Sequence, residues 1–150
     1  MAELKINELL SYALESVSSD LHLSVGSYPM VRMNGQMKKL QLPIMDLSTM
    51  KSIRDEVLNE HQLKRFDENL EIDFSAALEG KGRFRVNFFQ QIRGLAAVFR
   101  AIPEIPKGFD ELALPPILEN LSMLDRGLVL LTGPTGSGKS TTLAAMVDHI

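Results

Sequence analysis

The chain of 150 residues contains no cysteine, which excludes disulfides and thiolate metal sites within it. Its three histidines, His22, His61 and His149, show no metal-ligand spacing, so structural or surface roles are expected for them. Aromatic residues make up only 6% of the chain, and the formal net charge is -3. Both values argue against a nucleic-acid partner, which would require a basic surface with stacking aromatics.

Long apolar runs are also missing. No stretch approaches the roughly 18 apolar residues that a transmembrane helix needs. The first 20 residues carry Glu3, Glu8 and Glu15 and lack the basic start and continuous apolar stretch of a signal peptide. We therefore expect a cytoplasmic protein, whose apolar share of 45% is ordinary for a globular core.

The most specific motif is a phosphate loop at residues 133–140, where Gly-Pro-Thr-Gly-Ser-Gly-Lys-Ser matches G-x-x-x-x-G-K-[ST]. The apolar run before it, residues 127–132, predicts a buried parallel strand. Residues 141–150 predict a helix. The apolar stripe of this helix consists of Leu143, Met146, Val147 and Ile150. A strand, a glycine loop and a helix bind phosphates through backbone N–H groups and the positive end of the helix dipole.

The loop predicts a site for ATP and Mg²⁺. Lys139 would reach the β- and γ-phosphates, and the Ser140 hydroxyl would ligate Mg²⁺. The nucleotide-binding residues expected in this region are Gly133, Pro134, Thr135, Gly136, Ser137, Gly138, Lys139, Ser140 and Thr141. A glycine-rich turn that binds nothing is the alternative, and the flanking strand and helix argue against it.

Residues 1–102 have the pattern of a compact α+β domain. Asn34-Gly35 suits a type I′ hairpin turn, and Asp46 or Ser48 is expected to cap a helix. The periodicity predicts helices over residues 6–17, 47–59 and 60–68, and strands over residues 20–24, 28–33, 36–40, 71–76, 83–91 and 95–102.

Residues 103–108 hold two prolines and a glycine and predict a linker between domains. A second domain over residues 109–150 begins with a helix at 117–124, which Pro115-Pro116 opens. A nucleotide-binding sheet needs several parallel strands with helices on both faces. Since only one strand and its following helix are expected here, this α/β domain is predicted to be truncated.

The expected strand over residues 83–91 separates apolar from basic side chains. Arg83 and Arg85 lie on the face away from the core, and Arg100 follows in the next strand. A guanidinium group pairs with phosphate oxygens through two hydrogen bonds and stays charged, so these arginines are candidate phosphate-sensing groups. A solvated basic face on an antiparallel sheet is the alternative.

Four segments carry a family resemblance. Ser19–Leu23, Arg83–Asn87, Ala97–Pro103 and Gly127–Met146 stand in the order seen in secretion and type IV pilus ATPases. The chain resembles the retraction motors of twitching motility more than the assembly ATPases, since Ser19–Leu23 follows a single helix here. The amino-acid sequence of the loop, residues 133–141, also resembles that of the retraction motor more than that of its accessory paralogue.

The resemblance implies a fold, an assembly and a mechanism. It implies a PAS-like N-terminal domain, the first elements of a RecA-like ATPase domain, and a homohexameric ring that engages a platform protein of the inner membrane. In such a ring Arg85 and Arg100, with Arg83 behind them, would approach the phosphates of ATP, and rotation about residues 103–108 would couple hydrolysis to movement.

The resemblance also implies what the chain lacks. The acidic box with its catalytic glutamate, the Walker B segment and the histidine box would lie after residue 150, so no catalytic residue is identifiable here. We expect the isolated chain to show no appreciable ATPase turnover. A PAS-like module that binds a partner or a nucleotide without catalysis, and another secretion ATPase, stay open as alternatives; a nucleic-acid translocase fits poorly.

Overall fold

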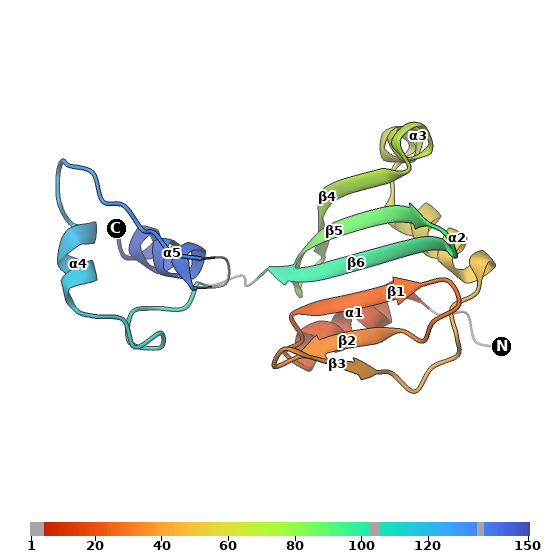
Figure 1. The fold of residues 1–150 in the computed structure, drawn as a ribbon, viewed down its shortest axis with the longest axis horizontal. Coiled ribbons are helices and arrows are strands. Elements are labelled where there is room, and N and C mark those ends of the chain that lie inside the picture. Colours follow the sequence, from red (N-terminus) through yellow and green to blue (C-terminus); the bar gives the residue numbers. More distant parts are fainter. Residues whose placement is uncertain (1–4, 103–105, 135–136) are drawn as a thin grey trace. The chain divides into compact units, whose positions relative to one another are not determined.

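The computed structural model describes residues 5–102, 106–134 and 137–150. The chain divides into two compact units, residues 1–103 and residues 104–150, and each is described by itself. Within residues 5–102 the strands form a six-stranded antiparallel sheet in the order β3-β2-β1-β6-β5-β4 (Figure 1). The predicted α+β pattern of strands and helices is therefore confirmed for this unit.

The elements of the first unit match the predicted ones, with shifts of one to a few residues at their ends. They are α1 (Ile6–Glu15), β1 (Asp20–Ser24), β2 (Met30–Met33), β3 (Gln36–Lys39), α2 (Leu47–Val57), α3 (Glu60–Asn69), β4 (Glu71–Leu78), β5 (Gly82–Gln91) and β6 (Gly94–Ile102).

Local chemistry sets several of these boundaries. Asn34 and Gly35 have positive φ values of 49° and 78°, as the predicted type I′ turn requires. Of the two predicted caps, Asp46 caps α2, because its Oδ1 accepts a hydrogen bond from the Thr49 backbone N–H at 2.7 Å. The α3 helix begins with a capping box between Asn59 and Gln62.

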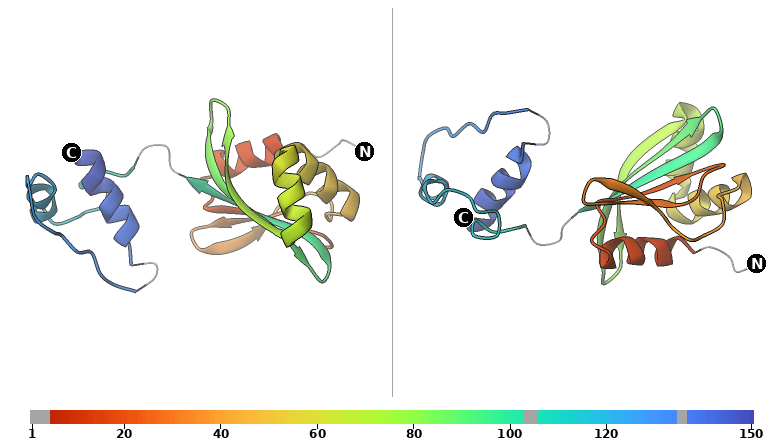
Figure 2. Two further views of the ribbon diagram at one scale, coloured as in Figure 1. Left: turned by 90° about the horizontal axis from the view of Figure 1, so that it is seen from above. Right: turned by 60° about the horizontal axis from the view of Figure 1, so that its bottom comes forward.

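One face of the sheet carries the core. Alternate strand residues on this face pack with the apolar stripes of α1, α2 and α3 in a single buried cluster. Phe88 and Phe99 meet edge to face there, with ring centroids 5.8 Å apart. Burying each such side chain stabilises the fold by about 1.5–3 kcal/mol. The sheet is twisted, as two further views show (Figure 2).

Pairing between distant segments organises the opposite face. β1 lies beside β6, with Asp20 opposite Arg100, and β5 pairs with β6, with Arg85 opposite Arg100. Strand side chains alternate between faces, so these three residues share the face that points away from the core.

The second unit contains α4 (Ile117–Ser122) and α5 (Lys139–His149). The predicted helix at 117–124 therefore ends two residues early. The predicted buried strand over residues 127–132 is wrong for this chain, because none of the described residues forms a ladder with it. A strand needs a hydrogen-bonded neighbour, and without one Leu128 is 82% exposed and Leu130 is 73% exposed.

The apolar stripe predicted on α5 is only partly buried. Met146 is buried, whereas Leu143, Val147 and Ile150 are exposed. Besides Met146 the helix buries Ala145, and its His149 ring meets Phe109 edge to face at 5.2 Å between centroids. None of the helices in the described ranges combines the length and apolar character needed to traverse a bilayer.

Candidate functional site

The phosphate loop leads into α5, as the motif predicts. Thr135 and Gly136 lie outside the described residues. Gly133 has a φ of 148°, and a Cβ built on it would lie 2.8 Å from the Ser137 Oγ, so a larger residue would clash there. Gly138 has a φ of 88°, a left-handed conformation that glycine adopts without strain.

Lys139 is the first residue of α5, and its side chain turns back over the loop. Its Nζ donates a hydrogen bond to the Pro134 carbonyl oxygen at 2.6 Å. The Thr142 N–H makes the first hydrogen bond of the helix, to the Gly138 carbonyl at 2.8 Å. The N–H groups before Thr142 have no acceptor within the helix, so this end of α5 offers donors and a lysine charge to an anion.

The hydroxyl groups of Ser140 and Thr141 are exposed on the first turn of the helix. Ser140 supplies one hard oxygen ligand of the kind that Mg²⁺ accepts. In the part of the chain that the structure describes, no group of three acidic, histidine or cysteine side chains gathers to hold a metal. The first turn of α5 therefore offers hydroxyl ligands to a cation, without a set of carboxylates beside them among the described residues.

The structure brings two of the three candidate arginines together. Arg85 and Arg100 occupy directly opposed positions on β5 and β6, and both side chains are 65% exposed. Arg83 lies two residues from Arg85 and pairs with Ile102 instead. Like charges placed opposite each other on a sheet normally destabilise it. Each of the two arginines is compensated by an aspartate.

Asp73 on β4 compensates Arg85. The Arg85 Nε donates to both carboxylate oxygens at 3.1 Å, and its Nη2 donates to Oδ2 at 2.7 Å. These hydrogen bonds from Arg85 hold the pKa of Asp73 below its usual value, and they raise the pKa of Arg85. Both groups are thus charged at neutral pH.

Asp20 on β1 compensates Arg100. The Arg100 Nε donates to Oδ1 at 2.9 Å, the Ser19 hydroxyl donates to Oδ2 at 2.8 Å, and the Arg32 Nε lies 3.4 Å from Oδ2. The Asp20 side chain is only 6% exposed. Burial raises the pKa of Asp20, but the hydrogen bonds from Arg100 and Ser19 outweigh it and hold the pKa below its usual value.

His22 follows Asp20 on the same face of β1. Its Nε2 is buried and has no hydrogen-bond partner in the described parts of the chain. Burial lowers the pKa of His22, and the charges of Arg32 and Arg100 lower it further against the opposing effect of Asp20. A neutral imidazole is therefore favoured beside the arginines.

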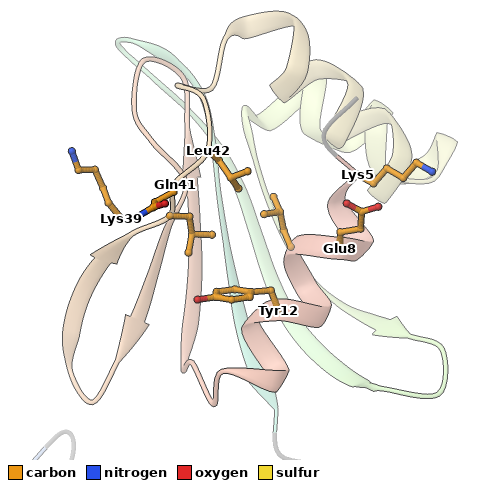
Figure 3. Close-up of a pocket in the computed structure, with 8 residues that line it drawn as sticks. Lys5, Glu8, Tyr12, Lys39, Gln41 and Leu42 are labelled. Atoms are coloured by element: carbon orange, nitrogen blue, oxygen red, sulfur yellow. The ribbon is translucent and has the colours of Figure 1, made fainter. Parts of the chain in front are cut away.

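A hollow of about 310 Å³ lies on the sheet between the two arginines. It is lined by Asp73, Arg85, Asn87, Val98 and Arg100. A larger hollow of about 530 Å³ lies between α1 and the segment after β3 (Figure 3), where Tyr12 and Leu42 face it from opposite sides. The larger hollow holds neither the candidate arginines nor residues of the loop.

The sequence analysis missed the aspartates and Arg32. The position of Asp73 could be predicted from the sequence, because Asp73 lies two residues after Glu71 and therefore on the same face of a predicted strand. The role of Asp20 was not readable, since the contact with Arg100 depends on the pairing of β1 with β6, two segments that lie 80 positions apart.

Comparisons with known proteins find several relatives of this chain. Residues 1–150 match the model of the type II/IV secretion system protein family. The chain is 46% identical over 145 residues to the type IV pilus retraction ATPase PilT of Pseudomonas aeruginosa, covering 97% of this chain and 42% of that protein. It is 48% identical over 122 residues to a twitching motility protein of Neisseria gonorrhoeae, covering 81% of this chain and 33% of that protein.

The fold of this chain is also similar to that of a solved structure. The crystal structure of the pilus retraction motor PilT with bound ADP superposes with a TM-score of 0.87 at 40% identity, covering 98% of this chain and 43% of that one. The chain thus spans less than half the length of the relatives that it matches.

Proposed function

Because the chain belongs to the type II/IV secretion system protein family, we propose that it is the nucleotide-binding N-terminal part of an ATPase that retracts type IV pili. The phosphate loop at the start of α5 carries this proposal. Its Gly133, Gly138 and Lys139 have the conformations and the side-chain direction that an anion site needs. The similarity to PilT, solved with ADP, supports a nucleotide as the ligand.

In this function the loop residues bind and orient the triphosphate. Lys139 exchanges the Pro134 carbonyl for phosphate oxygens, and backbone N–H groups of the loop surround them. Ser140 contributes a ligand to Mg²⁺, which neutralises charge on the phosphates when it is bound. The residues that activate water belong to the remainder of the protein, so the isolated chain is expected to be inactive.

Arg85 and Arg100, with Arg83 as a further candidate, supply positive charge to the same phosphates. This role is supported by the directly opposed positions of Arg85 and Arg100, whose exposed guanidinium groups lie on one face of the sheet. Guanidinium groups stabilise the charge that develops on a transferred phosphoryl group.

The larger assembly belongs to the same proposal. Residues 1–102 act as a PAS-like domain, residues 109–150 begin a RecA-like domain, and residues 103–108 are the hinge between them. Six copies form a ring in the cytoplasm at the inner-membrane base of the pilus, where the ring turns a platform protein. The relatives named for pilus retraction and twitching motility support this role.

The proposal is tested by titrating the full-length protein with a fluorescent ATP analogue and by measuring phosphate release. Lys139→Ala should abolish Mg²⁺-dependent turnover and weaken binding by roughly 100-fold, as the loss of a phosphate-binding charge does. Lys51→Ala is the matched control, because Lys51 is an exposed lysine on α2 that belongs neither to the loop nor to the hinge. Turnover that persists without Lys139 would disprove the proposal.

A noncatalytic binding module is the second candidate, and the unpaired residues 127–132 favour it for the isolated chain. A loop that lacks its neighbouring strand is less preorganised for phosphate. The 150-residue chain would then bind the analogue weakly and without dependence on Mg²⁺, although the full-length protein hydrolyses ATP.

A further inference from the structure

We propose that Asp73 and Asp20 are positioning residues, which hold Arg85 and Arg100 so that both guanidinium groups present their free ends to one phosphate group. The inference rests on the proposed function, since it assigns roles within the same nucleotide site. It adds a difference between the two arginines: Arg100 is fixed by a buried carboxylate, and Arg85 is held by an exposed one.

The hydrogen bonds show which edge of each guanidinium is used. Arg85 gives Asp73 its Nε and Nη2, and Arg100 gives Asp20 its Nε. Within residues 5–102, 106–134 and 137–150, no acceptor is bonded to the Arg85 Nη1 or to either Nη of Arg100. A guanidinium bound along its Nε side keeps its terminal N–H groups for a second anion.

The two free ends belong to neighbours on the sheet. Arg85 and Arg100 are opposite each other in the ladder and both line the hollow of about 310 Å³. Side chains at opposed positions have Cβ atoms about 5 Å apart, a separation that one phosphate group can bridge. An anion between them would also relieve the repulsion between their charges.

The two carboxylates differ in exposure. The Asp73 side chain is 41% exposed, so solvent screens its pairing with Arg85 and the pair can open at little cost. Asp20 is only 6% exposed, so moving Arg100 away would cost this buried carboxylate its shortest charged contact and leave it only Ser19 and the longer contact with Arg32. Arg85 is therefore the arginine that adjusts to the phosphate, and Arg100 is the fixed contact.

The first experiment compares ATP turnover of the full-length protein and its Asp73→Asn, Arg85→Ala and doubly substituted variants. Asp73→Asn should lower kcat about tenfold and leave KM within about twofold, because a misplaced group loses part of the roughly 100-fold that 1 Å can cost. The double variant should be no slower than Arg85→Ala, since Asp73 acts only through Arg85.

Asp55→Asn is the matched control, because Asp55 pairs with Arg54 at the same 2.7 Å distance on α2. An Asp73→Asn protein as fast as this control would overturn the proposal. A double variant much slower than Arg85→Ala would overturn it as well. Turnover that Lys139→Ala leaves unchanged would instead refute the proposed function.

NMR of the arginine Nε–H groups tests the positioning without turnover. The 150-residue chain should show a slowly exchanging Arg85 Nε–H signal that Asp73→Asn removes and Asp55→Asn keeps. Added tripolyphosphate should shift the side-chain signals of both Arg85 and Arg100. Equal exchange of the Arg85 signal in the two variants, or a shift confined to one arginine, would contradict the proposal.

Discussion

Phe84, Phe88 and Phe99 in the first unit are at most 1% exposed, whereas Leu128 and Leu130 in the second unit are 82% and 73% exposed. Both sets are apolar residues in runs that predict buried strands. The difference lies in where the hydrogen-bonding neighbours come from. Strands β4, β5 and β6 follow one another through short turns and pair in sequence order, so the segment supplies its own partners.

A parallel strand cannot obtain its hydrogen-bonding partner in this way. It cannot pair with the segment that follows it, because a helix must first carry the chain back across the sheet. Residues 127–132 are followed by the loop and α5, and the described residues of the second unit supply no neighbouring strand. An antiparallel meander therefore completes its core locally, whereas a segment that needs a parallel neighbour cannot obtain it from the residues next to it.

Amide hydrogen exchange should show the largest contrast between the units. In the 150-residue chain, amides in the centre of β5 and β6 should exchange at least about 1,000-fold more slowly than those of residues 128–131, because only the former are held in a ladder within a core. Mass spectrometry of peptides from each region measures this difference.

The full-length protein provides the matched comparison for this experiment. If sequence outside the chain supplies the neighbouring strands, residues 128–131 should become protected there while β5 and β6 stay unchanged. Strong protection of 128–131 in the 150-residue chain would break the comparison.

Substitutions at the two kinds of apolar residue should differ by several kcal/mol. Phe88→Ala should lower the free energy of unfolding by about 3–5 kcal/mol, because Phe88 is fully buried against Phe99. Leu130→Ala should change it by less than about 0.5 kcal/mol, as exposed positions do. Both tyrosines, Tyr12 and Tyr28, lie in the first unit, so tyrosine fluorescence in urea follows that unit.

A loss of more than about 2 kcal/mol from Leu130→Ala would contradict the assignment of Leu130 to an unpaired segment. A small effect of Phe88→Ala would show that the first unit does not depend on its aromatic pair. The difference between the variants is the quantity to compare, because differences in buried area are more reliable than absolute sums.

Much of the first unit could be predicted from the sequence, because its signals are local. Asn34-Gly35 specifies its turn, Asp46 caps its helix, and alternation along β5 separates Phe88 from Arg85. The glycine-rich turn into α5 could also be predicted from the fixed spacing of its glycines and Lys139, and its binding of phosphate stays a prediction. In each case the deciding neighbours lie within a few residues.

The remainder depends on contacts that no local pattern specifies. The strand predicted at residues 127–132 failed, because periodicity shows which residues can pair but not whether a partner is present. The role of Asp20 was missed, because Asp20 reaches Arg100 only through the pairing of β1 with β6. Whether Arg85 and Arg100 bind phosphate stays a prediction.

Acid should weaken the first unit through His22, with an effect smaller than that of Phe88→Ala. Burial lowers the pKa of His22 in the folded protein below the 6.5 of an unperturbed imidazole. The unfolded chain therefore binds a proton more readily than the folded one, so stability is complete above about pH 6.5 and falls as the pH drops toward the folded pKa.

Urea unfolding at about pH 7 and about pH 5, followed by tyrosine fluorescence, measures this loss. The window lies above the lowered pKa values of Asp20 and Asp73, whose contribution to stability is lost only in stronger acid. His22→Gln should flatten the pH dependence within the window, because glutamine does not titrate. If acid weakens His22→Gln as much as the unsubstituted chain, the buried imidazole is not the source.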